Sequence, residues 1–410
     1  MYICTFKNQI DIFMNPLSVR LTSLSPSETF AMSQKSNELK AQGIDVVNLS
    51  VGEPDFNTPD HIKDAAKKAI DHNFSFYSPV PGFLDLRKAI CEKLKNENQL
   101  DYSPDMIVVS NGAKQSLCNV VLALVNRDEE VIIPAPYWVS YPQMVKLAEG
   151  KPVYVYAGIE KNFKITAQQL EEAITPKTKA LMLCSPSNPT GSVYSKEELK
   201  SLADVLAKHP NVFVISDEIY EHINYVGKHE SIAQFENIRD RVIVVNGVSK
   251  GYAMTGWRIG WIAAAKWIAS ACGMLQGQYT SGPSSISQKA ALAAYTGDQS
   301  CVEEMRKVFE RRKNMAVSML REIPGLEVND PQGAFYIFPD CKSYLGKSFN
   351  GTILNTATDL AMFILEEGHV ACVGGDAFGA PGCIRLSYAT SDANLEKAIV
   401  RIKNTLAKLG

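Results

Sequence analysis

The 410-residue chain lacks several features that mark whole classes of protein. No apolar run approaches the roughly 20 residues that a membrane-spanning helix needs. The formal net charge is only -2, which gives no electrostatic case for nucleic acid or a membrane surface as a partner. Neither G-x-x-x-x-G-K-[ST] nor a G-x-G-x-x-G after the first predicted strand occurs, so nucleotide binding is not indicated.

The nine cysteines form no recognisable framework. Their number is odd, no C-x-x-C pair occurs, and the six histidines do not cluster with them. This pattern predicts reduced, buried thiols, and we expect neither disulfides nor a metal. The first 13 residues lack the continuous apolar core and the small-residue cleavage site of a signal peptide. We therefore expect a cytoplasmic protein in which residues 1–13 are an extension outside the core, and Met14 is a candidate natural start.

A chain of this length predicts two domains. Between about residues 60 and 270, short β-branched apolar runs alternate with helical stretches such as 195–209, where Ser195 and Glu198 have capping-box spacing. Such runs are typical of strands buried on both faces, so we expect an α/β fold with a mostly parallel sheet covered by helices. The runs are MIVV (106–109), EVIIP (130–134), ALMLC (180–184), VFVIS (212–216) and VIVVN (242–246).

After about residue 300 the pattern changes to long amphipathic helices and isolated strands. We expect helices over 303–323 and 394–409 and strands within 333–339 and 383–389, which together are typical of a smaller α+β domain. The expected division is a large domain over 61–300 and a small C-terminal domain over 301–410. The N-terminal segment 14–60 is expected to contribute to the small domain.

Polar residues of unusual type follow the predicted strands of the large domain, and open α/β sheets bind ligands at that edge. After MIVV, Asn111 and Gly112 turn the chain, and a helix is expected to begin at Ala113 and Lys114. Exposed N–H groups at a helix start suit a phosphate or carboxylate. A turn that leads into a helix is also common without any ligand.

Three more strand ends carry candidate ligand contacts. Trp138 follows EVIIP and suits either stacking on a planar ligand or packing in a core or interface. Asn188 lies between two prolines in SPSNPTG (185–191), a dense turn signal that is equally typical of a surface loop. Asp217 directly follows VFVIS, where a buried carboxylate needs a partner, so it is either an N-cap or bound to a ligand. Tyr220 shares its face if the strand passes into a helical turn.

Lys250 and Arg258 are two cations in VNGVSKGYAMTGWRIGW (245–261), a segment that is otherwise typical of a protein interior. Together with the aspartate, asparagine and tyrosine above, they form the set that one planar cofactor needs. In pyridoxal phosphate enzymes a lysine amine forms the Schiff base, and a carboxylate keeps the pyridine nitrogen protonated. Arginine and backbone amides hold the phosphate. These residues therefore predict pyridoxal phosphate as the cofactor.

Several long motifs resemble those of the class I aminotransferases, which have the aspartate aminotransferase fold. They are SPSNPTG, SDEIYEHI, VSKGYAMTGWRIG and IRLSYA, with NLSVGEPDFNTPDHI (48–62) and YWVSYP in addition. The resemblance covers essentially everything after Met14. It implies a large domain with a seven-stranded type of sheet, and a smaller α+β domain.

The resemblance also implies roles for matching positions. Lys250 would form the Schiff base and then move a proton between the substrate Cα and the cofactor C4′. The other implied cofactor contacts are Asp217 at the pyridine nitrogen, Tyr220 and Asn188 at the ring hydroxyl, Trp138 stacked on the ring, and Ser249, Arg258 and the backbone of Ala113 and Lys114 at the phosphate. Many family members carry a serine three residues before the lysine, where this chain has Gly247. That departure removes one expected hydrogen bond, worth about 1 kcal/mol.

The resemblance assigns further residues to the substrate and to a second subunit. Arg385 would bind the substrate α-carboxylate in a bidentate grip, and Gly52 would offer its backbone to the same group. Trp138 and Asn188 would also border the substrate. Tyr77 matches a tyrosine that reaches the phosphate of the neighbouring subunit, which implies a homodimer with shared active sites.

Which amino acid is the substrate depends on how the protein binds the distal carboxylate of that substrate. Some aspartate aminotransferases use an arginine for it, but the segment 274–288, where we would expect that arginine, contains no arginine or lysine. The bacterial subgroup that the chain resembles uses a lysine and a threonine, here Lys114 and Thr29. The alternatives are that Lys114 is a phosphate neighbour or a solvated helix-start lysine, and that Thr29 is a helix cap.

We therefore expect transamination of L-aspartate with 2-oxoglutarate to oxaloacetate and L-glutamate, by a ping-pong mechanism. The alternative within the family is an enzyme with aromatic, prephenate-like or broad amino-acid specificity. A non-catalytic module that keeps the cofactor is disfavoured because both Lys250 and Arg385 are present.

Overall fold

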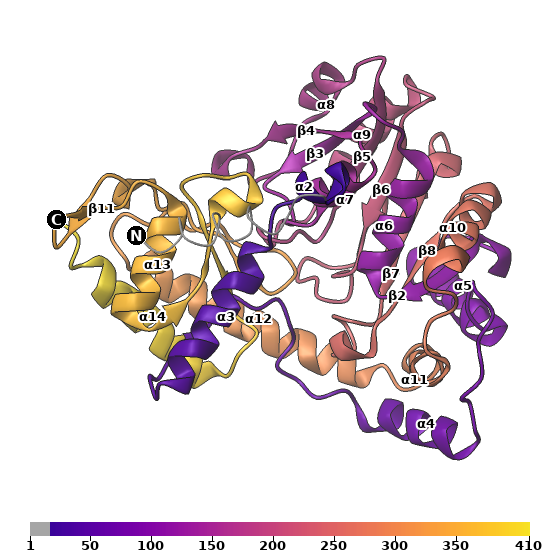
Figure 1. Cartoon of the computed structure of the whole chain (residues 1–410), viewed down its shortest axis with the longest axis horizontal. Coiled ribbons are helices and arrows are strands. Elements are labelled where there is room, and N and C mark those ends of the chain that lie inside the picture. The colour runs from indigo at the N-terminus through magenta and orange to yellow at the C-terminus, as the bar shows by residue number, and fades with distance from the viewer. Residues whose placement is uncertain (1–16) are drawn as a thin grey trace.

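The computed structural model describes residues 17–410, and the predicted extension at residues 1–13 lies outside this range. The larger part is built on one seven-stranded sheet, and a smaller part combines helices with short strands (Figure 1). The predicted α/β class with a mostly parallel sheet is confirmed. Among the helices of residues 17–410, none has both the length and the apolar character that crossing a bilayer requires.

The sheet has the strand order β2–β8–β7–β6–β5–β3–β4. Adjacent strands run parallel, except that β8 is antiparallel to both β2 and β7. The predicted apolar runs lie in five of these strands, and the pattern did not single out β4 or β8. The bounds are β2 Ile107–Asn111, β3 Glu130–Ala135, β4 Lys151–Tyr156, β5 Thr178–Cys184, β6 Phe213–Asp217, β7 Val242–Gly247 and β8 Ile259–Ala263.

Helices cover both faces of the sheet because successive strand residues point to opposite faces. In β2, Val108 belongs to the apolar cluster that contains α6, α7 and α10, whereas Val109 belongs to the cluster that contains α4, α5, α9 and α11. The predicted capping box of Ser195 and Glu198 is confirmed at the start of α9. The bounds are α4 Asp60–Asp71, α5 Leu84–Asn98, α6 Ala113–Leu124, α7 Tyr141–Leu147, α8 Ala167–Ala173, α9 Lys196–Ala207, α10 Lys266–Tyr279 and α11 Ser285–Thr296.

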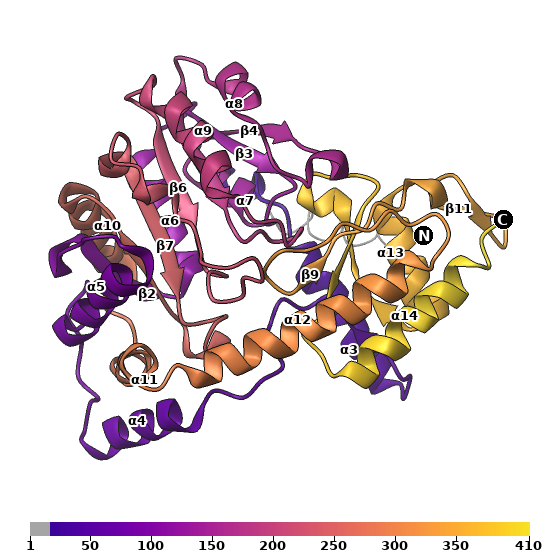
Figure 2. The same ribbon diagram turned by 180° about the vertical axis from the view of Figure 1, so that it is seen from behind.

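The smaller part has its own apolar cluster, which the N-terminal segment joins through Val47. There β1 pairs in parallel with β12, and α14 packs against α12 and α13 (Figures 1 and 2). Helix α12 links the two parts, since Val302 packs with the sheet cluster and Phe309 with the smaller one. The bounds are α2 Val19–Thr22, α3 Glu28–Ala41, α12 Ser300–Arg321, α13 Ala357–Gly368, α14 Asp392–Leu406, β1 Val47–Asn48, β9 Tyr336–Ile337, β10 Ser348–Phe349, β11 Thr352–Ile353, β12 Val370–Ala371, β13 Val373–Gly374 and β14 Ile384–Ser387.

Candidate active site

A cavity of about 450 Å³ lies where the carboxyl ends of the parallel strands meet the smaller part. Strand β6 ends at Asp217 and β5 at Cys184, and both residues line the cavity. Of the residues predicted for the site, all but one border this space. They are Thr29, Gly52, Ala113, Lys114, Trp138, Asn188, Asp217, Tyr220, Ser249, Lys250, Arg258 and Arg385. The exception is Tyr77, which is 99% exposed on the single chain.

Lys250 follows β7 through a short turn, and its ammonium is directed into the cavity. Its Nζ donates a hydrogen bond to the carbonyl oxygen of Gly52 over 2.6 Å. Burial lowers the pKa of this lysine to about 8; Glu53 opposes the shift, and the cations Arg385 and Arg258 add to it. An amine with such a pKa is partly neutral near pH 7, which is the state a nucleophile or a base requires.

Asp217 caps a turn at the end of β6, and the chain does not enter a helix there. Its Oδ1 accepts the backbone N–H of Ile219 over 3.2 Å, and its Oδ2 accepts the hydroxyl of Tyr141 over 2.6 Å. Burial raises the pKa of this carboxyl to about 6, even though both hydrogen bonds and Lys250 act in the opposite direction. The carboxylate therefore lacks a cation close enough to compensate its burial within the described residues.

The start of α6 and the side chain of Arg258 place several hydrogen-bond donors close together. Gly112 precedes the helix with a φ of +82°, and its position provides no side-chain cap, so the first N–H groups of α6 stay available to an anion. The Arg258 guanidinium donates to the carbonyl of Thr255 over 2.9 Å and to that of Asn111 over 3.3 Å. A Cβ on Gly112 would collide with this guanidinium, so glycine permits the close approach.

Arg385 is a buried cation, 1% exposed, on β14. Its Nη1 donates to Asn188 Oδ1 over 3.0 Å and its Nη2 to the Ser50 carbonyl over 2.5 Å. Within residues 17–410 its buried Nε has no hydrogen-bond partner, and Arg385 forms no salt bridge with a carboxylate. The loop 185–191 that carries Asn188 is largely buried, so the surface-loop alternative is wrong. A buried guanidinium without an acidic partner suits a carboxylate ligand.

Lys114 and Thr29 face the same cavity from opposite parts of the molecule. The Nζ of Lys114 lies 4.9 Å from the ring centre of Trp138, and burial, followed by the charge of Arg258, lowers its pKa. Thr29 is the second residue of α3, whose N-cap position is Ser27, and its buried Oγ1 has no hydrogen-bond partner among residues 17–410. The alternative that Thr29 is a helix cap is therefore wrong.

The cavity is also lined by residues that were not singled out from the sequence, among them Tyr141, Tyr336, Glu53 and Cys184. Glu53 accepts a hydrogen bond from Thr255. Tyr141 could have been found, because it follows Trp138 by three residues and opens a helix. Tyr336 lies more than a hundred positions from Tyr220, whose hydroxyl is 2.8 Å away, and no local signal indicates that contact.

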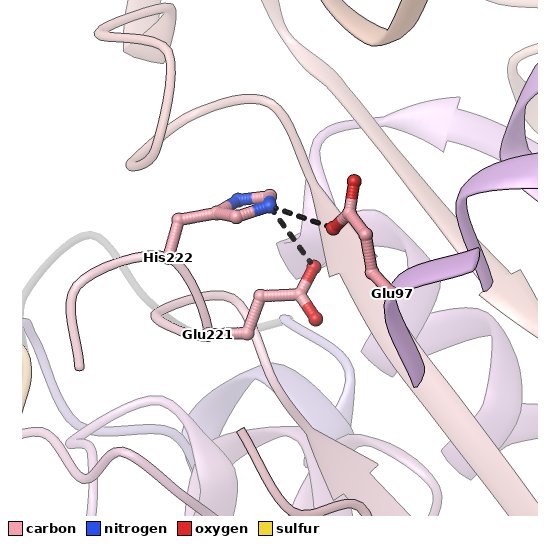
Figure 3. A group of neighbouring side chains, drawn as sticks. All are labelled: Glu97, Glu221 and His222. Atoms are coloured by element: carbon pink, nitrogen blue, oxygen red, sulfur yellow. Dashed lines mark hydrogen bonds and ion pairs between the residues drawn. The ribbon is translucent and has the colours of Figure 1, made fainter. Parts of the chain in front are cut away.

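A second cluster of titratable side chains lies outside the cavity and contains Glu97, Glu221 and His222 (Figure 3). His222 Nε2 lies 3.1 Å from Glu97 and 3.8 Å from Glu221. The spacing would suit a metal ion, but the ammonium of Lys93 already contacts Glu221 and lies 3.5 Å from Glu97. Burial alone would raise the pKa of Glu221, yet the neighbouring cations outweigh it and the pKa is lowered. This cluster is an ion-pair network that anchors the segment after Asp217.

The fold and this cavity define an α/β protein with a ligand site at the carboxyl edge of its sheet, and comparison with known proteins identifies the family. The sequence profile of aminotransferase class I and II matches residues 44–402, so the chain belongs to this family of amino-group transferases.

Individual relatives extend the comparison over almost the whole chain. A probable aspartate/prephenate aminotransferase of Rickettsia bellii is 48% identical over 399 residues, which cover 97% of this chain and 100% of the relative. An aspartate aminotransferase of a Bacillus species is 49% identical over 388 residues, which cover 94% of this chain and 98% of the relative. A crystal structure of the Rhizobium meliloti aspartate aminotransferase superposes with a TM-score of 0.93 at 42% identity. The superposition covers 96% of this chain and 99% of the crystallised one.

Proposed function

We propose that this aminotransferase uses pyridoxal 5'-phosphate to move the amino group of L-aspartate to 2-oxoglutarate, giving oxaloacetate and L-glutamate in two half-reactions. The observation that carries the proposal is the set of uncompensated charges around one cavity. Within residues 17–410, Arg385 is a buried cation without a carboxylate partner, and Asp217 is a buried carboxylate without a close cation. A substrate carboxylate would compensate Arg385, and the protonated ring nitrogen of a cofactor would compensate Asp217.

The residues present fit the cofactor. Arg258, Ser249 and the first N–H groups of α6 would hold its phosphate, since all of them line the cavity and Arg258 lies against Gly112, directly before α6. Asp217, oriented by Tyr141, would pair with the pyridine nitrogen. Bound pyridoxal phosphate supplies an electron sink for the electrons released at the substrate Cα.

Lys250 would hold the cofactor covalently and afterwards move a proton at the substrate Cα. Its lowered pKa, about 8, makes a neutral amine accessible near the working pH, as a general base requires. Tyr220 and Asn188 would donate to the ring oxygen, and Trp138 would cover one ring face. Arg385 would orient the substrate through its α-carboxylate, with Gly52 beside it.

The distal carboxylate of aspartate would lie between Lys114 and Thr29. Both residues line the cavity, Lys114 has no acidic partner within residues 17–410, and Thr29 Oγ1 is buried without a partner. Two cationic positions at separate places in one cavity, Lys114 and Arg385, favour a dicarboxylate over a monocarboxylate substrate.

A second candidate substrate is prephenate. The Rickettsia relative is named an aspartate/prephenate aminotransferase, and prephenate also carries two carboxylates. The cavity is bordered by Phe30, which is 72% exposed, so an apolar surface is available beside the charged positions. Amino transfer from L-aspartate to prephenate, measured against transfer to 2-oxoglutarate, would separate a dual enzyme from one restricted to aspartate and glutamate.

We also propose a cytoplasmic homodimer with shared active sites. Tyr77 is almost fully exposed on one chain, together with Phe76 at 82%, which is unusual for two adjacent aromatic side chains. A second copy would cover them and bring Tyr77 to the neighbouring cofactor phosphate. The domain division at residues 60 and 300 belongs to this proposal, with the smaller part moving over the substrate.

The first experiment is the visible absorption spectrum of the purified protein, recorded before and after addition of L-aspartate, L-alanine or L-phenylalanine. A cofactor band that L-aspartate discharges fastest supports the proposal. Faster discharge by another amino acid would keep the cofactor and refute the substrate. Absence of a band after incubation with pyridoxal phosphate would refute the cofactor.

A further inference from the structure

Tyr336 contacts both halves of the cavity from strand β9 and is fully buried. Its hydroxyl lies 2.8 Å from the hydroxyl of Tyr220. Its ring centre lies 4.6 Å from the guanidinium carbon of Arg385. The hydroxyl also occupies the space into which a side chain on Gly52 would project. One side chain therefore connects the residue proposed for the cofactor ring oxygen with the residue proposed for the substrate carboxylate.

We propose that Tyr336 is a positioning residue with two separable effects, an inference that rests on the proposed function above. Its hydroxyl donates to the oxygen of Tyr220, so that the Tyr220 proton is directed to the cofactor ring oxygen. Its ring face holds the guanidinium of Arg385 in the orientation that receives a carboxylate.

The direction of the hydroxyl contact follows from donor counting. Two hydroxyls that share one hydrogen bond use one proton between them, and the other proton stays available. If Tyr220 donated to Tyr336, it could not also donate into the cavity. Tyr220 is the only hydrogen-bond partner of the Tyr336 hydroxyl within residues 17–410, so donation from Tyr336 satisfies its buried proton. In a low dielectric, a donor that itself accepts a hydrogen bond becomes a stronger donor.

The ring contact follows from the burial of Arg385. Burial lowers the pKa of its guanidinium, and Phe378, 4.9 Å away, offers a second aromatic face. Strand β9 pairs with β14, with Tyr336 opposite Ser387, and this register places the ring close to Arg385. A desolvated cation against an aromatic face is stabilised and also fixed in its orientation.

Two substitutions separate these effects, and a third serves as the matched control. Tyr336→Phe removes the hydroxyl and keeps the ring, whereas Tyr336→Leu removes both. Tyr388→Phe removes a buried hydroxyl of the same kind, 3.0 Å from Tyr225, that does not line the cavity. Each holoenzyme is titrated with acid and base to find the midpoint of its visible absorption change. The dissociation constant of succinate, a dicarboxylate without an amino group, is measured by calorimetry, and thermal unfolding checks the fold.

The expected pattern differs between the variants. Weaker donation to the ring oxygen disfavours its negative charge, so Tyr336→Phe should move the spectral midpoint to higher pH by about half a unit. Its succinate affinity should stay within about twofold of the parent. Tyr336→Leu should show the same spectral shift and bind succinate about tenfold more weakly. Tyr388→Phe should change neither quantity.

Two results would overturn the inference. One is an unchanged spectral midpoint in Tyr336→Phe. The other is a loss of succinate affinity in Tyr336→Phe as large as that in Tyr336→Leu. If Tyr336→Leu fails to fold, the Tyr336→Phe midpoint still decides the first effect. The aromatic contact with Arg385 is then tested by Phe378→Leu, which should weaken succinate binding without a spectral shift. Failure of the proposed function itself is recognised separately, because the parent protein would then show no cofactor band.

Discussion

Replacing Lys114 with methionine tests how the substrate is chosen. The change removes the ammonium but keeps most of the apolar stem and the backbone N–H at the start of α6. The backbone contribution to phosphate binding is therefore retained, and only the side-chain contribution is lost. Because burial and Arg258 already lower the pKa of this lysine, its cation is costly to keep and gains most when an anion binds beside it.

The magnitude follows from one charge-assisted hydrogen bond. Such a bond contributes about 1.5–3 kcal/mol, so kcat/KM for L-aspartate should fall by about 10- to 150-fold. L-Alanine has no distal carboxylate, and its kcat/KM should change by less than about threefold. Steady-state kinetics with both amino acids measures the ratio, and Lys146→Met, a half-exposed lysine of α7 that does not line the cavity, is the control.

The two alternative roles of Lys114 predict other outcomes. A phosphate neighbour would give equal losses with both amino acids and weaker cofactor binding. A solvated helix-start lysine would give no loss with either. Equal losses would refute the assignment of Lys114 to the distal carboxylate.

Three further outcomes are expected. Arg385→Lys should lower kcat/KM for L-aspartate by about 100-fold, since one ammonium cannot form the bidentate pair; a loss below about tenfold would contradict that grip. Lys93→Met should lower the free energy of unfolding in urea by about 3–5 kcal/mol, because the buried charge of Glu221 then lacks the lysine ammonium. The double variant with Glu221→Gln should recover much of that lost free energy of unfolding. Capture of pyridoxal phosphate by the apoenzyme should accelerate as pH rises and level off above about 8, where Lys250 is neutral. A rate in stopped-flow absorbance that still rises with pH above about 9.5 would refute the lowered pKa.

Local signals predicted those elements whose stability is decided locally. The capping box of Ser195 and Glu198 fixes the start of α9 from four residues, and the structure contains it as expected. Continuous apolar runs predicted five strands because buried strands contact helices on both faces. Strand β4 lies at the edge of the sheet with most of its side chains exposed or half-exposed, so this rule does not apply to it.

The site could be predicted in part because of sheet topology. Parallel strands bring their carboxyl ends to one edge, so residues that follow separate strands, such as Asp217 and Lys250, meet without any sequence proximity. The partners that orient them follow no such rule. Tyr141 reaches Asp217 from the first turn of α7, and Tyr336 reaches Tyr220 from the smaller part of the molecule. Their positions depend on how helices and the two parts pack, which a single sequence does not display.

The glycine at position 247 shows how packing explains a departure from the family pattern. Gly247 lies opposite Gly260 where β7 and β8 run antiparallel, and a Cβ on Gly247 would stand 2.7 Å from the Ile259 carbonyl oxygen. A Cβ on Gly260 would in turn collide with the backbone N–H of Ala113. A serine at 247 would push β8 away from β7, and β8 begins directly after Arg258. Gly247 thus lacks the hydroxyl that would donate a hydrogen bond to the phosphate. At the same time it lets β8 approach β7 closely enough to set Arg258 against the start of α6.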